Sequence, residues 1–335
     1  MMNKIMKDEH KENEMLGKNN PYAVPIAIVI AGAMLSGTIY YNFQNPSNSA
    51  VGIKNQKTVA EENIPISAFE ESVLPSAGVA LPVSWDDLGA KLVSVGVIDA
   101  DRFKALYDER AAFTQEYRTL LLGENDDKLK ITADNAGYLL NLFWALGLAS
   151  KNPILDSGEM VNKAYGGAGN FASTGGWTMS QGSAMDHYSR HKFFSLTAEQ
   201  QDLVDRVSRG IYRPCCNNST HFPDCNHGMA MLGLLELMAS QDVSEQDMWK
   251  AALAVNSYWF PETYLTMAVH MKNKGVVWKD VIPQEMLGIN YSSASGYQKI
   301  ASQVVQPQGR QGGSGCSVET GEAVAPQRQQ SGCGI

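Results

Sequence analysis

An uncharged apolar segment near the N-terminus constrains this chain more than any other feature. No charged residue occurs between Asn19 and Ile53, and residues Pro21–Tyr41 are almost continuously apolar. Roughly 20 helical residues, each rising about 1.5 Å, cross the apolar core of a bilayer about 30 Å thick. Tyr22 and Tyr40 lie at the two ends of this segment, where aromatic side chains meet the membrane surface. We therefore expect residues 21–41 to form a single transmembrane helix.

The lysines around this segment predict its orientation. Four precede it closely, and the next two follow it at a distance: Lys4, Lys7, Lys11 and Lys18 before, Lys54 and Lys57 after. Because positive charge is retained on the cytoplasmic side, residues 1–20 should be a cytoplasmic tail and the C-terminal domain should be extracytoplasmic. A cleaved signal peptide is the alternative, but its apolar region usually has only about 7–15 residues, which favours an uncleaved signal anchor. The membrane is thus an expected partner through a single-pass anchor.

The remaining sequence divides into three parts by composition and periodicity. Residues 42–83 are rich in Asn, Ser, Pro and Glu and are expected to form a flexible tether. Residues 84–305 show apolar spacing near 3.6, with a capping box at Thr197–Gln200, and almost nothing alternates as a strand does. Residues 150–181 lack periodicity, but the embedded aromatic side chains favour an ordered loop. Residues 306–335 have no apolar face and should form a disordered tail, so the expected fold is all-α, a helical bundle-like domain behind the membrane helix.

Charge and motif content exclude several classes of function. The net charge of -8 and the absence of a Lys/Arg cluster argue against a nucleic-acid partner. No Ser-His-Asp order, paired-carboxylate motif or nucleotide-binding loop stands out, which gives hydrolase and kinase functions little support.

A segment between two predicted helices carries most of the chemistry. Residues 212–228 hold three of the five cysteines and two of the six histidines. Cys215, Cys216, Cys225 and His227 could close a tetrahedral zinc site, although their spacing matches none of the usual zinc patterns. Thiolates also suit copper(I), so the expected cofactor is copper or zinc. Asp224 is placed to cap the next helix, which would put Cys225 at its first position, where the helix dipole favours a thiolate.

Other histidines and cysteines are additional candidates. His187 and His191 are four residues apart and would share one face of a helix, either as ligands or as a solvated pair. His221 lies within the cysteine-rich segment itself. The tail thiols, Cys316 and Cys333, either pair with each other or reach the cluster on flexible backbone.

The same cysteines leave two further functions open. In a thiol-disulfide oxidoreductase, Cys225 would be the nucleophile and Cys215 or Cys216 would resolve the mixed disulfide. In a non-catalytic envelope interaction protein, one of these pairs would be a structural disulfide, as exported proteins commonly have. Five cysteines cannot all pair within one chain, and the sequence does not establish whether the protein is an enzyme.

A short part of this segment resembles a known family. Tyr212-x-Pro214-Cys215, a further Cys, then Asp224-Cys225 before His227-Gly228 are similar to the PCYCGC-motif proteins, which are exported bacterial proteins. Only Cys215 and Cys216 stand where that family has three closely spaced cysteines. The resemblance covers about forty of the 335 residues and implies an exported bacterial module with Cys ligands, without implying a reaction.

Overall fold

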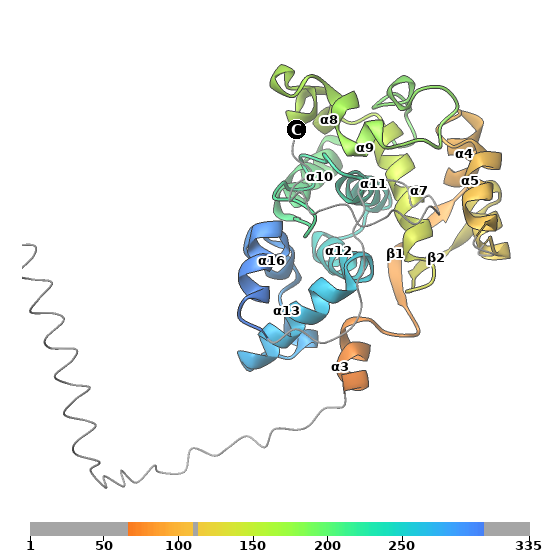
Figure 1. The fold of residues 1–335 in the computed structure, drawn as a ribbon. Coiled ribbons are helices and arrows are strands. Elements are labelled where there is room, and N and C mark those ends of the chain that lie inside the picture. The colour runs from red at the N-terminus through yellow and green to blue at the C-terminus, as the bar shows by residue number, and fades with distance from the viewer. Residues whose placement is uncertain (1–65, 110–112, 305–335) are drawn as a thin grey trace, which may run out of the picture. The chain divides into compact units, whose positions relative to one another are not determined.

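The computed structural model describes residues 66–109 and 113–304 (Figure 1). The predicted cytoplasmic tail and signal anchor, most of the tether, and the tail thiols Cys316 and Cys333 lie outside the described residues. Among the residues that are described, no helix has both the length and the apolarity needed to cross a bilayer.

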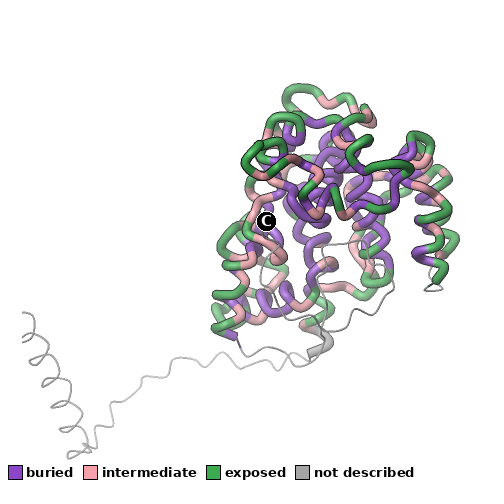
Figure 2. The backbone as a smooth tube through the Cα atoms, turned by 45° about the horizontal axis from the view of Figure 1, so that its top comes forward, coloured by how far each residue is buried: buried purple, intermediate pink, exposed green. Residues whose placement is uncertain are grey.

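Two helices form the centre of the domain. Helix α7 (Ala136–Ala149) packs along helix α11 (Asn226–Ser240), and both are buried over nearly their whole surface (Figures 1 and 2). Their backbones touch at two glycines: a Cβ atom on Gly147 would lie 2.1 Å from the Met229 carbonyl oxygen, and one on Gly233 would lie 2.5 Å from that of Phe143. An apolar helix of this kind, without a polar face, is stable only when other elements cover it on every side.

Helices from both halves of the chain provide that cover. Helix α10 begins at the capping box predicted from the sequence, in which Thr197 and Gln200 each bond the other's backbone N–H. Helix α13 begins at a proline, whose missing N–H costs nothing in the first turn. Besides the central pair, the described helices include α3 (Ile66–Val73), α4 (Leu88–Ser94), α5 (Ala100–Asp108), α6 (Gln115–Leu122), α10 (Ala198–Gly210), α12 (Glu245–Trp259), α13 (Pro261–Asn273), α14 (Pro283–Leu287), α15 (Ile289–Ser292) and α16 (Ala294–Ala301). Helices α4, α10 and α12 pack directly against that pair.

The prediction of a mainly helical domain is confirmed, but a small sheet accompanies the helices. Strand β1 (Val79–Asp86) pairs antiparallel with β2 (Asn125–Ile131), with Val79 opposite Ile131. Leu81, Val83 and Trp85 alternate inward along β1, which is the pattern of a half-buried strand. Helix α3 and strand β1 both begin before residue 84, so the folded domain starts earlier than the sequence boundary suggested.

The segment without periodicity is ordered by short helical turns. Trp177 is buried and donates from Nε1 to the Val97 carbonyl at 2.9 Å, while Trp144 of α7 donates to the Ser173 carbonyl at 2.6 Å. The Ser173 N–H in turn donates to the Asp224 carbonyl at 3.1 Å, which joins this segment to the start of α11. The short elements here and elsewhere are α8 (Pro153–Ser157), η1 (Glu159–Val161), η2 (Lys163–Tyr165), η3 (Ala168–Asn170), α9 (Ala172–Gly175), η4 (Ala184–Asp186) and η5 (Trp278–Asp280).

Candidate metal centre

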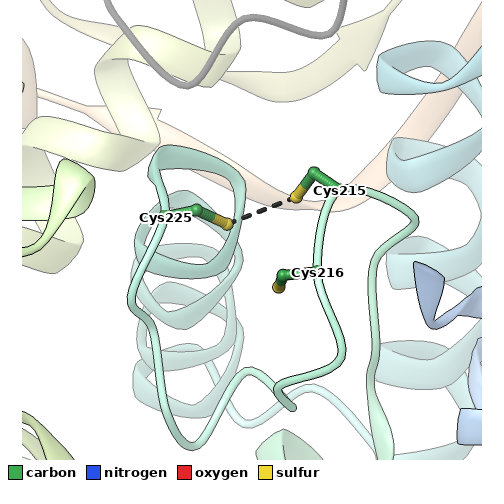
Figure 3. A group of neighbouring side chains, drawn as sticks. All are labelled: Cys215, Cys216 and Cys225. Carbon is green, nitrogen blue, oxygen red and sulfur yellow. Dashed lines mark hydrogen bonds between the residues drawn. The ribbon is translucent and has the colours of Figure 1, made fainter. Parts of the chain in front are cut away.

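The three clustered cysteines are positioned by the loop that joins α10 to α11. A β-bridge between Tyr212 and Ser219 folds this loop back on itself. The Tyr212 N–H donates to the Leu287 carbonyl at 2.8 Å, and its own carbonyl accepts from Asn256 Nδ2 at 3.1 Å. The fold-back brings Cys215 and Cys216 opposite Cys225, which directly precedes α11 (Figure 3).

The sulfur atoms of these residues converge. All three Sγ atoms lie within 4.8 Å of one another, and those of Cys215 and Cys225 are 3.4 Å apart. None of the three forms a disulfide, so the structural staple considered from the sequence is not present among the described cysteines. Metal–sulfur bonds of about 2.3 Å in tetrahedral geometry place sulfurs about 3.8 Å apart, close to the separations found here. Within the described ranges, this is the only such group of three potential ligands.

The buried guanidinium group of Arg213 lies against the cysteine cluster. Arg213 is 1% exposed, and its Nε donates to Cys225 Sγ at 3.0 Å. Its two terminal nitrogens donate to the Asn218 carbonyl at 2.9 Å, the Phe222 carbonyl at 3.0 Å and Asp224 Oδ1 at 2.6 Å. Four hydrogen bonds thus engage all three nitrogens of the guanidinium, and the loop folds around one positive charge.

Glycine allows the helix to approach this charge. A Cβ atom on Gly228, in the first turn of α11, would lie 2.5 Å from Arg213 Cζ. Any larger residue at position 228 would push the guanidinium away from Cys225 and Asp224.

The arrangement favours one thiolate and two thiols. Burial raises the pKa of Cys225, but hydrogen bonds from Cys215 and Cys216 and the charge of Arg213 lower it more, so it falls well below the usual range. Hydrogen bonding to Cys216 and Cys225 and burial raise the pKa of Cys215. A hydrogen bond from Cys215 lowers the pKa of Cys216, but bonding to Cys225 and burial outweigh this and raise it to about 12. Of the three residues, Cys225 is therefore the one whose thiolate form is stabilised, by its two neighbours and by Arg213.

The predicted capping of α11 is wrong by one residue. Cys225 is itself the N-cap and makes no side-chain cap hydrogen bond, and the helix begins at Asn226. Asp224 instead pairs with Arg213 and accepts from Asn218 Nδ2 at 2.8 Å. The ion pair takes Asp224 away from the helix end, and the thiolate depends on hydrogen bonds and Arg213 rather than on the position predicted within the helix.

His227 lies beside the cluster. Its side chain hydrogen-bonds to Cys225, which further lowers the pKa of that thiol. The ring packs against Trp259 and Phe260, with centroids 5.8 and 4.4 Å away, and its Nδ1 is buried without a hydrogen-bond partner. His227 is outside the group of three converging ligands, so it would have to shift to complete a four-ligand site.

The other predicted histidines do not join the cysteines. His187 and His191 are adjacent, with Nδ1 of the first 3.2 Å from Nε2 of the second, but they lie on a turn rather than on the predicted helix. The left-handed Ser189, at φ +50°, separates them. His221 lies between Glu159 and Asp205, with contacts of 3.1 and 2.9 Å.

The residue that sequence reasoning missed is Arg213. Its only signal was its place two residues before the Cys pair, and exposed arginines occur in such loops as a rule. Chemically, one preformed thiolate and two neighbouring thiols can capture a thiophilic ion or exchange with a disulfide. Comparisons with protein-family models, curated proteins and solved structures found no match for this chain.

Proposed function

We propose that this protein binds one soft metal ion, copper(I) or zinc, through Cys215, Cys216 and Cys225. The convergence of three sulfur atoms around a single stabilised thiolate is the observation that carries the proposal. Copper(I) is satisfied by three thiolates, whereas zinc needs a fourth donor, for which His227 is the nearest candidate. Arg213 compensates part of the negative charge that three thiolates bring to the buried site.

Metal binding at this site is coupled to protons. The pKa of Cys225 is lowered well below its usual range, while Cys215 and Cys216 keep their protons at neutral pH because their pKa values are raised. An ion that binds all three sulfurs must therefore displace at least the protons of Cys215 and Cys216, and its affinity rises with pH.

Thiol-disulfide exchange is the second candidate, because Cys215 and Cys225 have sulfurs only 3.4 Å apart. Burial weighs against it. The stabilised thiolate, Cys225, is 0% exposed, so a partner's disulfide has no access to the nucleophile that the sequence suggested. The more accessible Cys215 and Cys216 have raised pKa values and are poor nucleophiles. The site combines a buried, stabilised thiolate with two neighbouring thiols, which suits ion binding, and it lacks the exposed thiolate of an exchange enzyme.

The location of this activity is part of the proposal. The apolar segment Pro21–Tyr41 and its preceding lysines support a signal anchor with an extracytoplasmic C-terminal domain. The resemblance to PCYCGC-motif exported bacterial proteins points to the same side of the membrane. An exported site of this kind would hold or pass on a metal ion at the cell envelope.

Competition with chelators of known affinity tests the proposal. Full-length protein, purified in detergent without oxygen, should bind one copper(I) or zinc ion per chain, and Cys225→Ser should weaken binding at least tenfold. Replacing both tail cysteines, Cys316→Ser and Cys333→Ser, is the matched control and should leave the affinity unchanged. Protein that binds no ion and forms a reversible Cys215–Cys225 disulfide would favour the exchange enzyme instead.

A further inference from the structure

A second polar site lies further along helix α11, away from the cysteines. Glu236 is 1% exposed in the middle of this apolar helix, and its Oε1 accepts a hydrogen bond from Asn152 Nδ2. Its other oxygen, Oε2, has no hydrogen-bond partner of good geometry, and neither has the buried hydroxyl of Ser150. Ser150 lies close enough to Glu236 to lower the pKa of its carboxyl group, although the two side chains do not meet in hydrogen-bond geometry. Two unpartnered buried polar atoms at one place call for an explanation.

These groups line a pocket open to solvent. The cavity has a volume of about 310 Å³, which is at the lower end of the range for small-molecule sites. Ser150 and Glu236 belong to its wall, together with Gln201 of α10 and the partly buried, apolar Phe194 and Leu196. Asn152, which holds Oε1, is itself fixed by Gln201 Nε2 at 3.2 Å. The carboxyl group is therefore positioned and partly unsatisfied.

Two lysines and the start of helix α10 also line the pocket. Lys151 and Lys192 both belong to the wall; Lys151 is paired with Asp156 at 2.8 Å, whereas Lys192 is exposed. Thr197 and Ala198, at the N-terminus of α10, also belong to the wall; the capping box engages the N–H groups of Thr197 and Gln200, and the positive end of the helix dipole attracts an anion here. The pocket thus offers an acceptor at its buried wall and donors elsewhere.

We propose that this pocket binds a small amphoteric solute of the amino-acid class. The ligand's amine nitrogen donates to Glu236 Oε2 and to the Ser150 oxygen, and its carboxylate lies against Lys192 and the first turn of α10. Phe194 and Leu196 cover the short carbon chain between the two. The site is separate in position and chemistry from the proposed metal centre.

Binding would release a proton. Burial raises the pKa of Glu236 to about 8, against smaller opposing effects of Asn152 and Ser150, so the carboxyl group is mainly protonated at pH 7. The charged lining groups are Glu236, Lys151 and Lys192. An ammonium group at Oε2 favours the carboxylate, and the displaced proton leaves for solvent. Close to one proton should be released per ligand at pH 7, and the number should fall toward zero above pH 9.

Calorimetry with glycine, β-alanine and 4-aminobutyrate tests the proposal, with full-length protein in detergent. We expect at least one of the three to bind, with proton release revealed by titration in two buffers of different ionisation enthalpy. Glu236→Gln should weaken that binding at least tenfold and abolish proton release. Lys192→Gln should weaken it severalfold, while Lys279→Gln, an exposed control outside the pocket, should change nothing.

Three outcomes would overturn the proposal. The first is that none of the three probes binds, and the second is that Glu236→Gln binds as tightly as the parent. The third is that methylammonium binds as tightly as the amphoteric probe, because the anion-binding wall would then contribute nothing.

Discussion

Replacing Arg213 with Gln tests how far the buried positive charge stabilises both the domain and the Cys225 thiolate. The change removes the buried positive charge, leaves Asp224 buried without its ion pair, and weakens the bonds to the Asn218 and Phe222 carbonyls. Breaking one side of a buried pair costs about 3–5 kcal/mol, which is a large share of the roughly 5–15 kcal/mol that stabilises a domain. The free energy of unfolding should therefore drop by that amount.

The same substitution should act on the thiolate in a defined direction. Without Arg213, the pKa of Cys225 should rise, because the positive charge 3.0 Å from its sulfur is lost. Asp224→Asn should do the opposite and lower it, because a neighbouring negative charge is removed while Arg213 stays. The double variant should lose less stability than the two single variants summed, by about 1–3 kcal/mol.

Denaturant unfolding and the ultraviolet absorbance of the thiolate measure both effects in metal-free, reduced protein. Opposite shifts of the Cys225 titration in the two single variants would support the account. If both variants shift it in the same direction, or if neither does, Arg213 does not stabilise the thiolate and the electrostatic argument is wrong.

Three further predictions concern the fold, the buried carboxyl group and the anchor. Gly233→Ala should destabilise the domain by about 3 kcal/mol or more, because its Cβ would meet the α7 backbone. Gly137→Ala, with open space around it, is the control and should be neutral or stabilising by up to about 1 kcal/mol. Equal effects of the two substitutions in thermal unfolding would contradict the helix contact. The folded state holds the Glu236 proton up to about pH 8 while the unfolded chain loses it near pH 4.5, so stability should fall by about 4 kcal/mol between those values, and Glu236→Gln should remove most of this fall in denaturant titrations. Deleting residues 1–63 should release the protein from membranes in fractionation and leave its metal affinity unaltered; a deletion variant that stays in the membrane fraction would argue against the anchor.

Local patterns predicted the features that depend on neighbours in sequence. The capping box at Thr197–Gln200 gave the start of α10, and the close spacing of Cys215, Cys216 and Cys225 anticipated their convergence. Strand β1 was missed because Pro82, which has no backbone N–H to donate, argues against a strand, and because residues 84–87 also fit a helix capping box. The start of α11 was misplaced because the competing ion pair with Arg213 is not visible in the local sequence.

Features that depend on distant contacts could not be predicted in this way. Glu236 and Asn152 are 84 positions apart and meet only because α7 and α11 pack closely. A lone Glu in the apolar stretch of α11 is a weak signal of a buried carboxyl group, and its partners follow from the tertiary fold alone. The same holds for His221, which the loop places between Glu159 and Asp205 rather than beside the cysteines.

X-ray absorption spectroscopy of the full-length protein loaded with one equivalent of copper(I) tests the central claim most directly. We predict that three sulfur atoms coordinate the ion, with metal–sulfur distances of about 2.3 Å. Each of Cys215→Ser, Cys216→Ser and Cys225→Ser should remove one sulfur from that shell, while replacing Cys316 and Cys333 should leave it intact. A shell of nitrogen and oxygen donors, or one that survives the loss of Cys225, would contradict the proposed metal centre.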